Sequence, residues 1–251
     1  TLSHTGTTLS DGSYTLTAIA TNSAGNTATA SQSFTVDTAA PTVAISAISD
    51  DTGSLGDDFL TKDNTLIFTG TAEAGSSVVV KLNGSEIGTT TADGSGNWSV
   101  NRNDSTLLDG TYTLTATATD AAGNTATASQ TVVVDTHAQI GFTTNYKSLS
   151  ATPVLCGTTD IESGQTMTVT VAIGGGPSYT YSTTVASDGT WSVDTSTANP
   201  AESPSTSITY GNGASLTITA SGTDKAGNST TSSKAMLIDT SAPAITIITP
   251  V

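Results

Sequence analysis

Apolar and polar side chains alternate along the second hairpin-like segment of the chain. Every second residue of 112–118 is apolar and would fall on one face of an extended strand, with threonines on the other face. This period of two is typical of a half-buried β-strand. An Ala-Ala-Gly-Asn segment at 121–124 interrupts the alternation, and residues 125–134 resume it. We therefore predict a hairpin whose turn needs Gly and Asn to accept positive φ.

The sequence of this hairpin recurs along the chain. Residues 111–136 match residues 13–38 with few changes and residues 215–240 more loosely, with spacings of 98 and 104 residues. Such a period is that of a whole small domain with its own core. The predicted units are an incomplete repeat at 1–37, complete repeats at 38–136 and 137–240, and the start of another at 241–251. Because the first unit holds only the last part of a repeat, we expect the parent protein to continue in both directions.

The second repeat contains seven segments with strand character. They lie near residues 43–48, 66–70, 78–82, 87–91, 98–101, 112–119 and 125–134. Seven short strands in about a hundred residues is the count of an immunoglobulin-like sandwich. The predicted fold is all-β, with tandem seven-stranded immunoglobulin-like β-sandwiches arranged end to end as a rod. Trp98 and Trp191 recur one domain apart and are predicted to fill the two cores.

Charge and composition narrow the range of partners. The chain of 251 residues has 21 acidic and 6 basic residues and a formal net charge of -15. Long-range repulsion would oppose nucleic acid and anionic membrane surfaces, so we expect neither as a partner. No apolar run of 18 residues occurs, so we expect no membrane insertion of this segment. We also expect the segment to be a monomer. The only cysteine, Cys156, cannot form an intrachain disulfide and is expected to be a buried free thiol.

Acidic side chains crowd one connection of the second repeat. Asp50, Asp51, Asp57, Asp58 and Asp63 lie between its first two predicted strands. Two carboxylates about 4 Å apart repel by roughly 4 kcal/mol at an effective dielectric near 20, so the cluster costs stability unless a cation neutralises it. Ca²⁺ prefers six to eight oxygen ligands. The sequence therefore predicts a calcium site in this connection.

Further acids extend this hypothesis to both domain junctions, because successive loops alternate between the two poles of a sandwich. The candidates are Asp109 and the linker residue Asp135 facing Asp188 and Asp224, and Asp11 and Asp37 facing Asp120. Calcium at such a seam would fix the angle between neighbouring repeats. The alternative interpretation is that these aspartates only start turns and keep the surface soluble. In the third repeat the short segment 143–150 replaces the acidic connection, which argues against a full site there.

Several motifs resemble a known family. They are Val-Asp-Thr-Ala-Ala-Pro (36–41), Ile-Asp-Thr-Ser-Ala-Pro (238–243), Gly-Thr-Ala-Glu-Ala-Gly-Ser (70–76), Asp-Gly-Ser-Gly-Asn-Trp (93–98) and Ala-Thr-Asp-Ala-Ala-Gly-Asn (118–124). With them the chain resembles the bacterial immunoglobulin-like repeats of giant non-fimbrial adhesins exported by type I secretion. The resemblance implies a surface-tethered, extracellular chain of many domains, with Ca²⁺ bound by aspartates near the junctions. Among the linker aspartates it adds Asp239 as a ligand.

We therefore expect a secreted spacer segment of a bacterial adhesin. Its partners would be the adjacent repeats of the same chain and, through the full-length protein, a host-cell surface or glycan receptor. No catalysis is expected, because His4 and His137 are the only histidines and no serine-hydrolase or zinc-protease motif occurs.

Two alternatives stay open at this point. The third repeat could be a glycan-binding module, or the chain could be an accessory domain of a secreted enzyme that acts on polysaccharides. The first alternative rests on insertions at 174–177 and 199–213, near Tyr179, Tyr181 and Tyr210, which could form a sugar-stacking surface.

Overall fold

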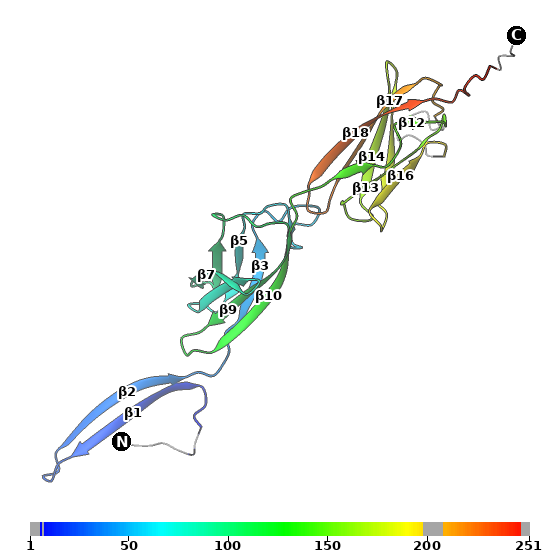
Figure 1. The fold of residues 1–251 in the computed structure, drawn as a ribbon. Helices are drawn as coiled ribbons and strands as arrows, with labels where there is room; N and C mark the ends of the chain where they lie inside the picture. Colours follow the sequence, from blue (N-terminus) through cyan, green and yellow to red (C-terminus); the bar gives the residue numbers. More distant parts are fainter. Residues whose placement is uncertain (1–5, 7, 198–207, 247–251) are drawn as a thin grey trace. The chain divides into compact units, whose positions relative to one another are not determined.

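The computed structural model describes residues 6, 8–197 and 208–246. Within these residues the chain consists of strands and turns, without a helix, so the all-β prediction is confirmed (Figure 1). The chain divides into two compact units, Thr1–Asp50 with Thr65–Val133, and Asp51–Asn64 with Val134–Val251. The acidic segment therefore groups with the third repeat rather than with the second. A search of the described residues for a helix that could span a membrane finds none.

The strands of the first unit follow the predicted pattern. Their bounds are β1 (Gly12–Thr21), β2 (Thr27–Val36), β3 (Val43–Ile48), β5 (Ile67–Ala72), β6 (Ser77–Leu82), β7 (Ser85–Thr91), β8 (Asn97–Asn101), β9 (Gly110–Thr119) and β10 (Thr125–Val134). All seven strands expected for the second repeat are present. An eighth, β4 (Leu60–Thr61), belongs to the second unit and was not predicted, because two residues are too few to show alternation.

The strands of the second repeat pair as two sheets. One sheet has the order β3-β5-β8 and the other the order β4-β10-β9-β6-β7. The pair β6–β9 is antiparallel with Val80 opposite Ala116, and β5–β8 is antiparallel with Gly70 opposite Trp98. Two sheets that enclose an apolar core are the architecture of an immunoglobulin-like sandwich.

The core of the second repeat comes from the alternating apolar positions. Leu114, Ala116 and Val80 are fully buried, and Trp98 is 3% exposed, as predicted. A Cβ atom at Gly70 would lie 2.3 Å from Cζ2 of Trp98, so the ring packs directly on bare backbone. Glycine is therefore required opposite this ring.

The second unit repeats the same sandwich. Its further strands are β11 (Ile140–Phe142), β12 (Lys147–Ser148), β13 (Val154–Thr159), β14 (Thr166–Ile173), β15 (Ser178–Thr184), β16 (Thr190–Asp194), β17 (Ser215–Thr223) and β18 (Ser229–Ile238). The sheets have the orders β11-β13-β16 and β12-β18-β17-β14-β15. Trp191 is 1% exposed and lies opposite Gly157, which repeats the glycine–tryptophan pair of the second repeat.

One expectation for this sandwich is wrong. Cys156 is a free thiol, as predicted, but it is partly exposed rather than buried. Its side chain lies on the outer face of β13, where the hydroxyl of Thr143 donates to Sγ at 3.3 Å. The alternation of the strand explains this position, because the neighbouring Leu155 takes the inward place and is fully buried.

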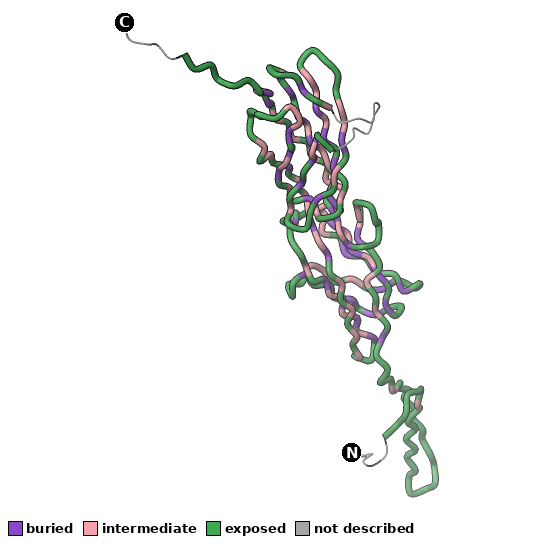
Figure 2. Tube along the Cα trace, turned by 90° about the vertical axis from the view of Figure 1, so that its right-hand side faces the viewer, coloured by how far each residue is buried: buried purple, intermediate pink, exposed green. Residues whose placement is uncertain are grey.

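The first hairpin shows what local sequence alone specifies. β1 and β2 pair in continuous register from Gly12 opposite Val36 to Thr21 opposite Thr27. Leu16 is nevertheless 58% exposed, although Leu114 at the same place in β9 is fully buried. Figure 2 shows this hairpin as exposed along almost its whole length. Strand pairing thus follows from the repeated sequence, whereas burial requires the opposing sheet.

Candidate functional site

The turn between β9 and β10 is held by Asp120. Its Oδ1 accepts hydrogen bonds from the backbone amides of Ala122, Gly123 and Asn124 at 2.8, 2.7 and 2.9 Å. Its Oδ2 accepts one from Nδ2 of Asn124 at 2.8 Å. These bonds, the side-chain bond of Asn124 first among them, lower the pKa of the Asp120 carboxyl. Both oxygens of this predicted calcium ligand therefore serve the fold of its own turn.

The turn between β17 and β18 uses the same arrangement. Oδ1 of Asp224 accepts a hydrogen bond from the amide of Asn228 at 2.7 Å, and Oδ2 accepts one from Nδ2 of Asn228 at 2.8 Å. Asp224 is only 5% exposed. A buried carboxylate is tolerated here because donors satisfy both of its oxygens.

The asparagine of each turn also reaches the linker that precedes its repeat. Nδ2 of Asn124 donates to the carbonyl oxygen of Asp37 at 3.1 Å, and Nδ2 of Asn228 donates to that of Asp135 at 2.8 Å. One amide thus joins the last hairpin of a repeat to the linker that precedes that repeat. The prediction of positive φ for this asparagine is wrong, because in the β9–β10 turn only Gly123 has positive φ. The recurrence of Asn26, Asn124 and Asn228 was the available sequence signal.

The linker aspartates hold the backbone on which they lie. Oδ1 of Asp37 accepts the amide of Ala39 at 3.0 Å, and Oδ1 of Asp135 accepts the amide of His137 at 3.2 Å. The backbone amide of Asp135 donates to the carbonyl of Thr61 in β4 at 2.9 Å. The linker at Asp135 is therefore bonded both to β4 and, through its carbonyl, to Asn228.

Other predicted ligands have carboxylates that interact with nearby protein groups. Oδ1 of Asp11 accepts the amide and the hydroxyl of Thr38 at 3.0 and 2.9 Å. Oδ1 of Asp188 accepts the amide and the hydroxyl of Thr190 at 3.1 and 2.7 Å. Oδ2 of Asp239 lies 3.8 Å from Nζ of Lys147. Asp109 directly precedes β9.

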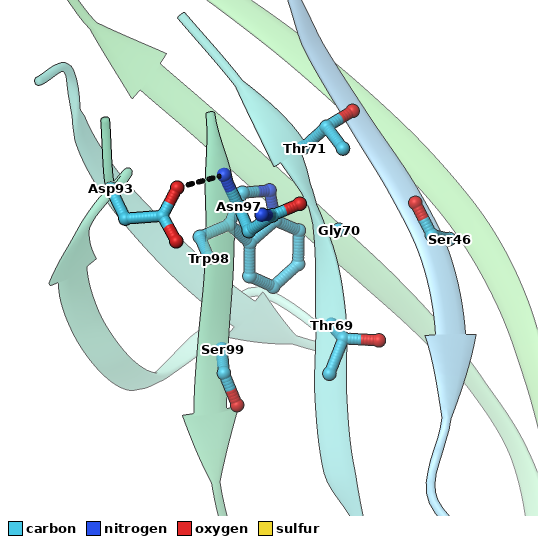
Figure 3. Close-up of a pocket in the computed structure, with 8 residues that line it drawn as sticks. All are labelled: Ser46, Thr69, Gly70, Thr71, Asp93, Asn97, Trp98 and Ser99. Carbon is cyan, nitrogen blue, oxygen red and sulfur yellow. Dashed lines mark hydrogen bonds between the residues drawn. The ribbon is translucent and has the colours of Figure 1, made fainter. Parts of the chain in front are cut away.

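Asp93, five residues before Trp98, likewise accepts hydrogen bonds from the backbone of its own turn. Figure 3 shows it beside a surface pocket of the β3-β5-β8 sheet, with its carboxylate turned toward the backbone of Asn97. Oδ1 accepts the amides of Ser95 and Asn97 at 2.8 and 2.9 Å, and these bonds lower the pKa of the carboxyl. Asp93 therefore holds the turn that precedes β8.

The acidic segment differs from these turns, because one of its carboxylates is incompletely satisfied. Oδ2 of Asp51 accepts the amide of Phe59 at 3.0 Å. Its Oδ1 is buried and has no hydrogen-bond partner within the described part of the chain. Burial raises the pKa of Asp51, and the negative charges of Asp58 and Asp57 raise it further. This is the repulsion that the sequence predicts for the segment.

The backbone of the same segment is strained. Asp50 has φ 46 and Phe59 has φ 61, which are left-handed conformations that side chains other than glycine rarely adopt. Oδ1 of Asp58 accepts the amide of Leu60 at 3.0 Å, and the amide of Asp63 donates to the hydroxyl of Thr61 at 2.9 Å. Strain of this kind at an unpaired acidic oxygen marks the segment as the candidate site.

Of the predicted acidic ligands, Asp51 has the surroundings that best fit Ca²⁺. Among the described residues, no group of three or more His, Cys, Asp or Glu side chains lies close enough together to hold a metal ion by itself. The donor type nevertheless fits Ca²⁺ at Asp51, where a buried carboxylate oxygen lacks a donor and other carboxylates lie near. Main-chain carbonyls and water would have to supply the other ligands.

The tyrosines of the third repeat do not form a sugar-stacking surface. Tyr181 and Tyr210 are each 1% exposed, and their hydroxyls are hydrogen-bonded to each other at 3.0 Å inside the core. Burial raises the pKa of Tyr210, and the bond to Tyr181 raises it further. Tyr179 is only partly exposed. Of the insertion at 199–213, residues 199–207 lie outside the described residues.

Comparison with known families decides the class of protein. A model of the bacterial Ig-like domain matches residues 1–38 and, separately, residues 39–136, which is more than half of the chain. The chain belongs to the bacterial Ig-like domain family. The family predicted from its motifs is thus confirmed. No protein with a curated functional description matches this bacterial Ig-like chain in sequence.

Solved structures of bacterial adhesins are similar to this bacterial Ig-like chain. A tetra-tandem repeat from the extending region of a large adhesion protein is 26% identical over 92% of this chain and 58% of that one, with a TM-score of 0.42. A Ca²⁺-stabilised adhesin that helps an Antarctic bacterium reach out and bind ice is 28% identical over 92% and 58%, with a TM-score of 0.36. This chain therefore spans 58% of the length of either relative. Because both TM-scores lie below 0.5, the assignment rests on the family match and the strand pairing.

Proposed function

We propose that the chain is a spacer segment of a giant bacterial surface adhesin, stiffened by Ca²⁺ bound at its acidic connection and its domain junctions. The full-length protein would be exported by type I secretion and would attach the bacterium to a host cell or another surface. Membership of the bacterial Ig-like family and the tandem repetition of closed sandwiches support this proposal. In this role the repeats act mechanically, through length and stiffness, and not as an enzyme.

The buried, unpartnered Oδ1 of Asp51 is the observation that carries the calcium part of the proposal. In water without a cation, this oxygen loses its solvation and gains no hydrogen bond in return, and Asp57 and Asp58 add repulsion. A divalent cation removes both costs at once. Asp51, Asp57 and Asp58 would be the principal acidic ligands, with Asp50 and Asp63 in the same connection.

The linker at Asp135 supports the idea that this connection affects stiffness. Its amide is bonded to β4, which closes the acidic connection, and its carbonyl is bonded to Asn228 of the third repeat. A cation that orders residues 51–64 would therefore also restrain the linker. Asp11, Asp37, Asp109, Asp120, Asp188, Asp224 and Asp239 stay proposed junction acids, most of which hold turns or linkers here.

Small-angle X-ray scattering tests this function directly. The 251-residue chain is measured with Ca²⁺ and with EDTA, together with Asp135→Ala and, as a matched control that also removes one charge, Glu86→Gln. We expect one elongated particle with Ca²⁺ and a broader distribution of maximum dimensions after chelation. Asp135→Ala should be broad in both conditions, whereas Glu86→Gln should follow the wild-type chain.

Identical scattering in all samples would contradict the proposed stiffening by calcium. If all samples give the same scattering profile, calcium does not stiffen the chain, and the aspartates act only in turns and in solubility. Isothermal titration with Ca²⁺ separates binding from stiffness: heat of binding without a change in scattering would leave a metal site and remove its mechanical role.

A further inference from the structure

We propose that residues 51–64, named here the docking loop, are a binding element for the β17–β18 turn that reads its main chain and needs no metal ion. The loop belongs by sequence to the second repeat but lies in the same compact unit as the third. This inference does not rest on calcium binding. It concerns hydrogen bonds of hydroxyl and ammonium groups, not the carboxylates of the loop.

Two side chains of the docking loop bind the turn directly. The hydroxyl of Thr52 donates to the carbonyl of Ala226 at 2.6 Å, and Nζ of Lys62 donates to the carbonyl of Gly227 at 2.9 Å. The same Thr52 oxygen accepts the backbone amide of Lys62 at 2.9 Å. Thr52 therefore closes the loop and attaches it to the turn through a single hydroxyl. The lysine brings a positive charge to main-chain oxygens within an otherwise acidic loop.

The backbone of the docking loop approaches the turn closely at Gly53. A Cβ atom on this residue would lie 1.9 Å from the carbonyl oxygen of Lys225, and Gly53 has φ 97. Glycine is thus required both by contact and by conformation. On the other side, a Cβ atom at Gly227 would lie 3.2 Å from the nitrogen of Gly53. The two segments meet backbone to backbone, without room for a side chain at Gly53.

A second turn of the same kind shows what docking changes. The turns at 120–124 and 224–228 differ only at their second residue, which is Ala121 in one and Lys225 in the other. Their internal amide bonds are alike, since Asp120 N to Asn124 O is 3.1 Å and Asp224 N to Asn228 O is 3.0 Å. Ala226 is nevertheless fully buried, whereas the corresponding alanine of the other turn is exposed. The docking loop accounts for that burial.

Recognition by this loop is directed at atoms that every such turn presents. Both hydrogen bonds end on carbonyl oxygens, and the close approach at Gly53 is also to a carbonyl. The side chain of Lys225 makes neither of these bonds. A turn of the sequence Asp-x-Ala-Gly-Asn should therefore be accepted whatever residue stands at its second position.

Hydrogen exchange measured by mass spectrometry on the full 251-residue chain tests the inference. The readouts are the amides of residues 51–64 and of the β17–β18 turn, with Ca²⁺ and with EDTA. Gly53→Val should accelerate exchange in both segments by about tenfold, because the side chain excludes the turn and breaks both hydrogen bonds. Gly56→Val is the matched control, since a Cβ there meets nothing nearer than 3.8 Å. Strand β14 in the same data shows that the sandwich stays folded.

Two further arms separate the parts of the inference. Lys225→Ala makes the turn identical to that at 120–124 and should leave exchange unchanged, whereas faster exchange would show that the side chain is recognised. Lys62→Met keeps the aliphatic stem but removes the ammonium, and should accelerate exchange less than Gly53→Val. Unchanged exchange in Gly53→Val would overturn the docking itself. If EDTA alone accelerates exchange in the wild-type chain as strongly as Gly53→Val does, the contact depends on a metal ion and the proposal fails.

Discussion

Residues 51–64 and residues 143–150 make the same connection in successive repeats, but they handle charge differently. Each contains a short strand, β4 or β12, at the first position of a five-stranded sheet. Each accepts the amide of the following linker aspartate, Asp135 on Thr61 and Asp239 on Ser148, both at 2.9 Å. The backbone part of the connection is therefore common to the two repeats.

Their side chains differ in how they compensate negative charge. The first connection places Asp51 next to Asp57 and Asp58 and leaves one of its oxygens without a donor. The second carries no aspartate and places Lys147 within 3.8 Å of Asp239. The fold thus fixes where the chain runs, while the charge at that place is free to vary. Under the proposed function, only the first connection would gain from an external cation.

Calcium should give the largest difference between the two connections. At a free concentration one hundred times the dissociation constant, Ca²⁺ should raise the free energy of unfolding by about 2.7 kcal/mol if it binds only the native state. Asp51→Ala should abolish this increment, and Lys147→Met should keep it. Urea unfolding with Ca²⁺ and with EDTA, followed by tryptophan fluorescence, measures it. An equal increment in Asp51→Ala would place the ion elsewhere.

Breaking the turn that receives the docking loop should have the next largest effect. Asp224→Ala removes the acceptor of the Asn228 amide and one of the two acceptors of its Nδ2, which should cost about 1–3 kcal/mol of unfolding free energy. Because the docking loop rests on this turn, its protection against hydrogen exchange should fall as well. The protection of residues 143–150 should stay unchanged, and a uniform loss in both connections would contradict the assignment.

Neutralising Asp51 should have a smaller effect with a characteristic pH dependence. In EDTA at neutral pH, Asp51→Asn should stabilise the chain by less than about 1 kcal/mol, since solvent screens the repulsion. The pKa of Asp51 is raised in the folded state, so its protonation favours folding. The advantage of the variant should therefore shrink as the pH falls through this raised pKa and vanish below the ordinary aspartate pKa near 4.

The difference in stability between the wild-type chain and Asp51→Asn separates the effect of Asp51 from that of the other acids. Carboxyls with lowered pKa, such as those of Asp120 and Asp188, lose their stabilising effect as the pH falls, but equally in both proteins. Thermal unfolding from pH 7 to pH 4 provides the comparison. An advantage of Asp51→Asn that grows on acidification would show that the carboxylate is stabilised, not strained.

The ion pair of the second connection should matter least. Lys147 and Asp239 have side chains 53% and 39% exposed, so water and salt screen their attraction. Lys147→Met should lower the melting temperature only slightly, and the difference should disappear in concentrated salt. A large loss that persists in salt would indicate that Lys147 acts through packing of its stem.

Elements with strong local signals were predictable from the sequence. Alternation located β9 and β10, and the recurrence of Trp98 and Trp191 identified the two cores. The Asn83-Gly84 turn has positive φ at both residues, as its sequence favours. These features depend on neighbours along the chain or on the repeat itself.

Features that depend on distant partners were not predictable in the same way. β4 is only two residues long, and its place follows from pairing rather than from periodicity. The Tyr181–Tyr210 bond joins residues 29 positions apart that the sequence alone suggested as part of a sugar-stacking surface. The docking of residues 51–64 depends on a carbonyl at Ala226 and on space at Gly53, neither of which a residue pattern reports.

The amide that ties each hairpin to the preceding linker has a consequence for how such genes can grow. Asn124 reaches Asp37, and Asn228 reaches Asp135, so every fastening needs one residue from either side of a repeat boundary. Both halves recur in phase, 98 residues apart in the first pair of repeats. An in-frame tandem duplication of one period restores the complete fastening wherever the break falls. One duplication can thus lengthen the chain, because the added repeat brings both partners of this hydrogen bond with it.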